Sequence, residues 1–368
     1  MSDVIPSPFV QPLEDTAYLL GLLVEITGQP ADDVLGRFRR EHGRLGTNVH
    51  DALDARGIEP YVWTDRLRDF YGSTDAFLFE SIAWNRTPTK NAMRRWIAQF
   101  LADREAGAAR VLVYGDGPGF DSFYFSSAGY RVSYFDLSPQ DVRFARRMFS
   151  DFGLRVEVLD SPAALESESF DAVICLDVLE HAPEPRTEVA LLTRALRKGG
   201  YLVVHAPFWY VHPDVGTHLR ANLRFSGSRK HLYANLGLKP VDAQLFWNPI
   251  VLEKTAGGPV SRRVPWSSWL RIRLGGWLLA SARLSRVPHR WTCALLKRAD
   301  QSRLQQLMEQ AAADIRRWEA ASSGASQVAR GGQTIAHGTT PHPDAMHDPP
   351  RSPPQVAPRH IPSRPSAT

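Results

Sequence analysis

The sequence has few cysteines and no long apolar run. Its two cysteines, Cys175 and Cys293, lie in apolar segments, which favours buried thiols in a reducing compartment over a disulfide framework. Residues 1–15 are acidic and interrupted by proline, unlike a signal peptide. No uninterrupted apolar stretch reaches the length that spans a bilayer. We therefore expect a cytoplasmic protein.

Positive charge is in excess, but it is unevenly spread. The formal net charge is +5, and much of the excess lies between Arg262 and Arg298, where acidic residues are absent. No recognisable RNA- or DNA-binding motif accompanies this basic segment, so we expect no nucleic-acid partner. The composition, with 43% hydrophobic and 23% charged residues, is that of a globular protein with a substantial core.

The most informative stretch is a strand, a glycine-rich turn, a helix and a second strand in close succession. Arg110–Tyr114 is a short apolar run rich in β-branched residues, as expected of a buried parallel strand. The turn Gly115–Gly119 has three glycines, which let the backbone approach a ligand closely. The helix expected at 120–128 points its N–H groups into the same space. After the strand Tyr130–Phe135 comes Asp136, whose carboxylate suits the two hydroxyls of a ribose.

The spacing of the glycines separates two kinds of nucleoside site. A dinucleotide fingerprint needs its third glycine at position 120, where this chain has Phe120, and Pro118 removes one backbone donor for a pyrophosphate. The observed G-x-G-x-G pattern resembles the first motif of class I S-adenosylmethionine (SAM) dependent methyltransferases, whose cofactor has no pyrophosphate. From this turn alone, a dinucleotide enzyme and a purely structural turn stay as alternatives.

Strands and helices continue to alternate as far as residue 206, which predicts an α/β fold with a doubly wound parallel sheet. The resemblance to class I SAM-dependent methyltransferases implies that this sheet is mostly parallel and seven-stranded. Ligands of such sheets bind at the carboxyl ends of the strands. Five polar or turn-forming residues fall at those ends, and their agreement carries more weight than any single motif. They are Gly115, Asp136, Asp160, Asp177 and Pro207.

Residues 110–207 resemble the core of class I SAM-dependent methyltransferases, especially quinone-pathway and small-molecule O-methyltransferases. The segments that carry the resemblance are VLVYGDGPG, VSYFDLS, VEVLDS, FDAVICLDVLEHAPEP and LRKGGYLVVHAPF. The resemblance implies SAM as cofactor and a small molecule as methyl acceptor. The cofactor contacts that it implies are Gly115, Asp116, Gly117, Gly119, Asp136, Leu137, Asp160, Ser161, Asp177 and Val178.

The resemblance also assigns roles to these residues. The glycines would lie near the methionine and ribose, Asp136 on the ribose hydroxyls and Leu137 against the adenine. The pair Asp160–Ser161 would reach the adenine edge, and the pair Asp177–Val178 would form the floor of the pocket. Asp116 can either shape the turn or contact the cofactor, and both interpretations stay open.

A hydroxyl nucleophile must lose its proton during methyl transfer, and an imidazole suits that task near neutral pH. His212 and His218, in the polar segment after the fifth strand, are the candidate bases. A metal site formed by His212, Asp214 and His218 is loosely spaced, so we expect no metal. His181 is expected to be structural.

Five regions are expected along the chain. Residues 1–104 form a helical N-terminal cap, 105–300 the SAM-binding core, 301–321 a C-terminal helix and 322–368 a disordered tail. Within the core, a helical insertion is expected at about 262–287. The sixth strand is expected at Val241–Trp247. For the seventh strand, Trp291–Lys297 is preferred over Ile250–Lys254.

The sequence therefore predicts a SAM-dependent methyltransferase that acts on a small molecule, with oxygen as the favoured acceptor atom. One alternative is a peripheral membrane enzyme for a lipid or polyprenyl substrate, because residues 266–284 are basic, amphipathic and rich in tryptophan. A helix packed over the active site explains the same residues. Another alternative is a binding protein that keeps the fold without turnover. The oligomeric state is left open.

Overall fold

The computed structural model describes residues 12–104, 109–165, 167–213, 215–255 and 257–284. The expected C-terminal helix, the tail, Cys293 and the candidate strand at 291–297 lie outside these residues. Cys175 lies inside them and is a buried free thiol, as expected.

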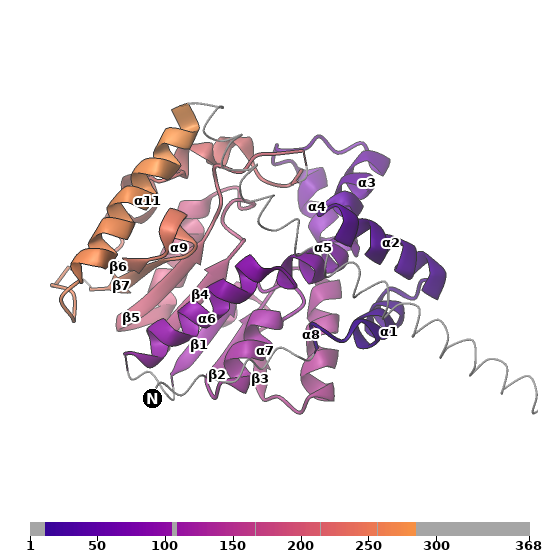
Figure 1. Ribbon diagram of the computed structural model, residues 1–368, viewed down its shortest axis with the longest axis horizontal. Coiled ribbons are helices and arrows are strands. Elements are labelled where there is room, and N and C mark those ends of the chain that lie inside the picture. The colour runs from indigo at the N-terminus through magenta and orange to yellow at the C-terminus, as the bar shows by residue number, and fades with distance from the viewer. Residues whose placement is uncertain (1–11, 105–108, 166, 214, 256, 285–368) are drawn as a thin grey trace, which may run out of the picture. The chain divides into compact units, whose positions relative to one another are not determined.

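A seven-stranded sheet forms the centre of the fold (Figure 1), with the strand order β3-β2-β1-β4-β5-β7-β6. The strands β1 to β5 are parallel, and β7 lies antiparallel between β5 and β6. This topology confirms the predicted fold class. The bounds are β1 Arg110–Tyr114, β2 Arg131–Phe135, β3 Val156–Val158, β4 Phe170–Leu176, β5 Leu196–His205, β6 Leu238–Ala243 and β7 Ile250–Lys254.

The preferred position of the seventh strand is wrong, because Ile250–Lys254 fills the antiparallel place. The observed strand carries a charged residue, Glu253, inside the sheet. Glu253 is only 3% exposed, and its carboxylate accepts hydrogen bonds from the Ser261 amide over 2.8 Å and from the Ser261 hydroxyl over 3.0 Å. Tertiary contacts thus compensate the burial of this charge.

The sixth strand begins and ends earlier than expected. It stops at Ala243, and η4 (Leu245–Trp247) follows as a 3₁₀ turn. Phe246 and Trp247 have φ values of 57° and 53°, which an extended strand cannot accommodate. The helix expected at 266–284 is present as α11, Trp266–Leu284. It follows β7, so it does not interrupt the two last strands as an insertion would.

Side chains alternate across the sheet and fill two hydrophobic cores. In β1, Val111 and Val113 face the core that includes α7 and α8, whereas Leu112 and Tyr114 face the core that includes α9 and α11. Helices on both faces make the sheet doubly wound. The bounds of the helices after β1 are α7 Phe120–Ser127, α8 Pro139–Asp151, α9 Pro185–Ala195 and α10 Arg229–Tyr233.

Residues 16–102 are helical, as predicted. The helices are α1 Thr16–Thr27, α2 Ala31–Gly43, α3 Thr47–Ala55, α4 Asp65–Ser73, α5 Ala76–Asn85 and α6 Pro88–Ala102. Leu19, Phe79 and Ile97, from three of these helices, belong to the same buried cluster as Val111 of the sheet. The N-terminal helices therefore share a core with the sheet. Among the described residues, no helix combines the length and the apolar character that crossing a membrane requires.

Candidate functional site

The glycine turn Gly115–Gly119 lies where β1 ends and α7 begins. Gly115 and Gly119 have φ values of 73° and 88°, a region that favours glycine. A side chain at Gly115 would collide with Val178, and a Cβ at Gly119 would lie 2.8 Å from Ala145 Cβ. The backbone thus needs glycine here both for its conformation and for its close packing.

Asp136 follows β2 and lies against this turn. Its Oδ2 accepts a hydrogen bond from the Gly117 amide over 2.7 Å, and its Oδ1 accepts one from the Ser138 amide over 2.8 Å. Burial raises the pKa of Asp136, although these backbone donors oppose the rise. Each oxygen keeps a further lone pair for a ligand hydroxyl. Leu137, beside it, is 72% exposed and could cover a flat ring.

Asp116 points away from the edge of the sheet. Its two carboxylate oxygens accept hydrogen bonds from the Asp121 amide over 3.0 Å and from the Ser122 amide over 2.7 Å. These bonds satisfy N–H groups in the first turn of α7. Burial and the charge of Asp121 raise the pKa of Asp116 to about 7. The structure therefore places this side chain in the turn, and a contact with cofactor stays a prediction.

Asp160 and Ser161 follow β3 at the same edge of the sheet. The Asp160 side chain is 90% exposed and forms an ion pair with Arg146 over 3.1 Å. Ser161 is half-buried and precedes a short 3₁₀ turn. Both residues follow the end of β3, as predicted, and the Asp160 side chain extends into solvent.

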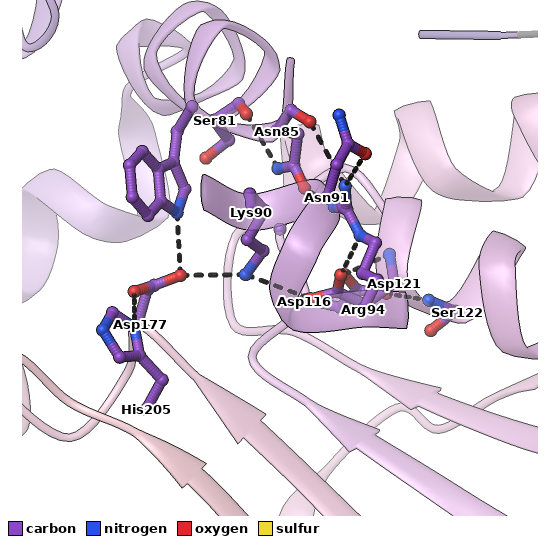
Figure 2. Close-up of polar contacts among 12 residues, drawn as sticks. Ser81, Asn85, Lys90, Asn91, Arg94, Asp116, Asp121, Ser122, Asp177 and His205 are labelled. Atoms are coloured by element: carbon purple, nitrogen blue, oxygen red, sulfur yellow. Dashed lines mark hydrogen bonds and ion pairs between the residues drawn. The ribbon is translucent and has the colours of Figure 1, made fainter. Parts of the chain in front are cut away.

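Asp177, at the end of β4, is the most strongly held carboxylate of the site (Figure 2). Its Oδ2 accepts hydrogen bonds from Lys90 Nζ over 2.8 Å and from the Trp84 indole over 2.8 Å. Its Oδ1 lies 2.6 Å from His205 Nδ1. Its φ is 61°, an uncommon value for a residue other than glycine. Burial alone would raise the pKa of Asp177, but Lys90 and His205 hold it well below its usual range.

Lys90 joins two segments of the core through one ammonium group. Besides Asp177, it pairs with Asp121 of α7 over 3.2 Å, and its side chain is only 4% exposed. Asp121 also pairs with Arg94, one turn further along α6, as Figure 2 shows. Burial opposes the charge of Lys90, but the two carboxylates outweigh it and the pKa of Lys90 is raised.

Sequence reasoning missed Lys90, Arg94 and Trp84. A signal was available, because Lys90 and Arg94 share a helical face with the buried Ile97 and Leu101 at spacings of three and four residues. Cations on the apolar face of an amphipathic helix indicate buried carboxylate partners, which the sequence alone does not identify.

A second polar cluster consists of Glu180, His181 and His218. One potential ligand atom from each residue lies within 4.8 Å of the others. His218 Nδ1 is 2.6 Å from the Tyr210 carbonyl, and His181 Nδ1 is 3.2 Å from the Thr217 carbonyl. Since a carbonyl only accepts hydrogen bonds, His218 Nδ1 carries the proton and its Nε2 offers a lone pair. His181 Nδ1 also lies 3.2 Å from the Tyr71 hydroxyl, and in the tautomer that donates to the Thr217 carbonyl its Nε2 offers a lone pair too.

These lone pairs face a carboxyl group that is itself only 1% exposed. The Nε2 atoms of His181 and His218 lie 4.0 and 3.9 Å from Glu180 Oε1. Neither carboxyl oxygen of Glu180 receives a hydrogen bond within the described chain. Burial raises the pKa of Glu180 well above its usual value, lowers that of His181 to about 4 and lowers that of His218 well below its usual value.

One carboxyl and two neutral imidazoles around a common point form a donor set that suits a divalent cation. The sequence predicted no metal site, and it missed Glu180. The set that it weighed included Asp214, which lies outside the described residues. The segment D-V-L-E-H contains Glu180 and His181, but His218 comes from a separate loop and only the fold brings it there.

His212, the other candidate base, lies beside this cluster without belonging to it. Its ring stacks on Tyr210 with a centroid distance of 5.5 Å and an angle of 9°. The Tyr210 carbonyl in turn holds His218. Of the two candidate histidines, the structure therefore brings His218 to the polar cluster and places His212 one contact away.

Comparison with known proteins agrees with the geometry. Residues 112–204 match the family model of a methyltransferase domain. A ubiquinone biosynthesis O-methyltransferase from Xanthomonas axonopodis pv. citri (strain 306) is 32% identical over 146 residues, which are 38% of this chain and 60% of that protein. One from Aromatoleum aromaticum (strain DSM 19018 / LMG 30748 / EbN1) is 36% identical over 104 residues, 27% of this chain and 44% of that protein.

Among solved structures, the chain is similar to a magnesium protoporphyrin IX methyltransferase from Synechocystis PCC 6803 with bound SAM. The identity is 22%, with 56% of this chain and 95% of that chain covered, and the TM-score is 0.36. The chain spans about half the length of the curated relatives it matches. The predicted resemblance to class I SAM-dependent methyltransferases is thus confirmed for the central part of the chain.

Proposed function

We propose that this chain, whose residues 112–204 belong to a methyltransferase domain, transfers the methyl group of SAM to an oxygen atom of a small molecule. The observation that carries the proposal is the convergence of the glycine turn, Asp136 and Asp177 at one edge of the sheet, in a matching segment of sequence. The O-methyltransferase relatives support oxygen as the acceptor atom.

The cofactor would lie across the carboxyl ends of β1, β2 and β4. Asp136 would accept the ribose hydroxyls, Leu137 would cover the adenine, and the pair Asp160–Ser161 would border its edge. The glycine turn would pass close to the methionine part, and the pair Asp177–Val178 would form the floor. A sulfonium carbon is already a strong electrophile, so positioning is the main task of these residues.

In the transfer, the acceptor oxygen forms a bond to the methyl carbon while the carbon–sulfur bond breaks, which leaves S-adenosylhomocysteine. The acceptor proton has to go to a base. We assign this role to the cluster of Glu180, His181 and His218, in which His218 Nε2 has a lone pair, and we keep His212 as the second candidate. Alternatively, Glu180, His181 and His218 would hold a divalent cation; His218 Nε2 would then be a ligand, and the cation would favour ionisation of the acceptor hydroxyl in place of a histidine base.

The two alternative functions predicted from the sequence are a binding protein and a peripheral membrane enzyme. A binding protein without turnover would keep the cofactor contacts, but nothing in such a role requires the buried cluster of Glu180 and two histidines. A peripheral membrane enzyme for a lipid or polyprenyl substrate would use the same chemistry on another acceptor. A cytoplasmic location stays a prediction.

The test uses the full chain. Calorimetric titration with SAM should give saturable binding, and radiolabelled methyl groups should pass from SAM to a phenolic probe such as catechol. Absence of SAM binding at millimolar concentration contradicts the proposal. Tight SAM binding without transfer to catechol or to any of a panel of aliphatic and aromatic hydroxyl compounds favours the binding protein.

A further inference from the structure

Helix α11 has one face that is fixed to the protein. On this inner face, the Trp247 indole donates a hydrogen bond to the Ile272 carbonyl over 3.0 Å. The Ser226 hydroxyl donates one to the Leu279 carbonyl over 2.8 Å. These bonds hold α11 beside β6, where Figure 1 shows it as the orange helix at the edge of the sheet. The opposite face of the helix therefore has a fixed orientation.

That opposite face carries large apolar side chains that are exposed to solvent. Trp266 is 72% exposed, Trp269 48% and Trp277 66%. Leu270 and Leu274 are also exposed, and the five residues follow one another at helical spacing, so they form a single stripe along the helix. We call these five residues the tryptophan stripe. A contiguous apolar stripe of this size on a helix indicates a surface that meets a partner.

The surroundings of the stripe are positively charged. The Arg273 guanidinium lies 5.5 Å from the Trp269 ring centre. Partial burial, together with the charge of Arg273, lowers the pKa of Arg229 on α10. No ion pair joins Arg229 or Arg273 to a carboxylate in the part of the chain that the structure describes. From Lys254 to Arg298, the sequence has no aspartate or glutamate at all.

We propose that the tryptophan stripe docks on an anionic lipid surface, with α11 lying in the plane of the membrane interface. Tryptophan rings favour the headgroup region, and the flanking arginines meet lipid phosphates. A second copy of this chain fits less well, because a twofold contact through α11 would bring arginines of like charge together. The proposal does not depend on methyl transfer.

Sedimentation of the full chain with vesicles tests it. The bound fraction should be at least about tenfold higher with phosphatidylcholine vesicles that contain phosphatidylglycerol than with phosphatidylcholine alone, and high salt should lower it. The double variant Trp269→Gln/Trp277→Gln should reduce binding about tenfold or more. Arg273→Gln should reduce it about fivefold, since it removes one cation from the surface.

Two control variants match these changes in chemistry. Val62→Gln alters an exposed apolar residue outside the tryptophan stripe, and Arg143→Gln alters an exposed arginine outside α11. Both variants should bind vesicles as the parent chain does. Quenching of tryptophan fluorescence by brominated lipids gives a measurement on the unchanged chain if a variant fails to fold.

Any one of four outcomes would overturn the proposal. The parent chain stays in solution with anionic vesicles, or it binds both vesicle types equally. The double tryptophan variant, shown to be folded by circular dichroism, could bind as strongly as the parent. A change in oligomeric state in that variant, without vesicle binding by the parent, would assign the stripe to a contact between copies.

Discussion

Lys90 Nζ lies 2.8 Å from Asp177 Oδ2, so a buried cation on a helix that precedes the sheet holds the carboxylate at the end of β4. The sequence motifs place Asp177 in the cofactor site, whereas Lys90 belongs to the N-terminal helices. This ion pair links the geometry of the site to a segment outside the matched domain.

Lys90→Met should weaken both the fold and the site. The substitution leaves Asp177 without its cation in a buried environment, and such losses cost about 3–5 kcal/mol in the free energy of unfolding. We also expect SAM affinity to fall about tenfold, because Asp177 loses its fixed position. Chemical denaturation and calorimetry measure the two effects. Lys198→Met, at an exposed position, is the control and should change neither. If Lys90→Met and Lys198→Met had the same stability and the same SAM affinity, Lys90 would have no role in positioning Asp177.

Asp136→Ala should lower SAM affinity about 30-fold or more. A carboxylate that accepts two hydroxyl hydrogen bonds contributes roughly 2 kcal/mol, and the same group also anchors the Gly117 amide. Calorimetric titration with SAM measures the effect. Asp54→Ala, on the exposed side of α3, serves as control. Binding by Asp136→Ala that matches the parent would remove this residue from the cofactor site.

His218→Ala should reduce methyl transfer about 100-fold or more, with SAM affinity kept within about threefold. His212→Ala should cause a smaller loss, since His212 reaches the cluster only through Tyr210. Radiolabelled methyl transfer gives turnover, and calorimetry gives affinity. His50→Ala, at an exposed site, is the control. Full activity in both His218→Ala and His212→Ala would exclude them as bases.

The chain should bind one Mn²⁺ ion at Glu180, His181 and His218, because the three donors already surround one point. Electron paramagnetic resonance of free Mn²⁺ measures the affinity without any need for activity. Glu180→Gln should weaken binding at least about tenfold, whereas the exposed Glu184→Gln should not. Absence of Mn²⁺ binding by the parent would leave the cluster with a role in proton transfer alone.

His42 should make the folded state sensitive to acid. Burial and the neighbouring Arg86 lower its pKa to about 3 in the folded chain, against the ordinary histidine value of 6.5. Because the unfolded chain binds the proton more readily, the free energy of unfolding keeps its full value above pH 6.5 and decreases as the pH drops below it. Between pH 7.5 and 5 the loss from this group is about 2 kcal/mol.

Denaturation at the two pH values tests this. His42→Gln is expected to lose about 2 kcal/mol less than the parent on acidification, and the control His50→Gln to follow the parent. Identical losses in all three chains would contradict a buried neutral imidazole at this position. The Nδ1 contact with the Phe38 carbonyl over 2.9 Å is the geometric basis for that state.

Local sequence was sufficient for the parts of the site that lie at strand ends. Asp136 and Asp177 could be placed because each follows an apolar strand directly, and the carboxyl ends of parallel strands meet at one edge. Helix α11 was found at its observed bounds because apolar residues recur in it at helical spacing. For Asp116 the sequence left two roles open; the structure shows its oxygens on the Asp121 and Ser122 amides, and a contact with cofactor stays a prediction.

Other features needed the assembled chain. The apolar character of Trp291–Lys297 favoured that segment over Ile250–Lys254 as the seventh strand, and only the folded structure supplies Ser261 as the partner of the buried Glu253. No sequence pattern assigned a role to Lys90, and its carboxylate partners are known only from the fold. In both cases a charged residue is buried beside a partner that neither strand nor helix periodicity can identify.

The sequence by itself determined the alternation of strands and helices as far as β5, the glycine turn and the edge of the sheet at which Asp136 and Asp177 lie, because these depend on short-range periodicity and spacing. Tertiary structure decided which side chains meet there. His218 joins Glu180 and His181 across a long loop, and Lys90 reaches Asp177 from a preceding helix. Those contacts arise from packing between segments far apart in the chain, and packing is a property of the whole fold.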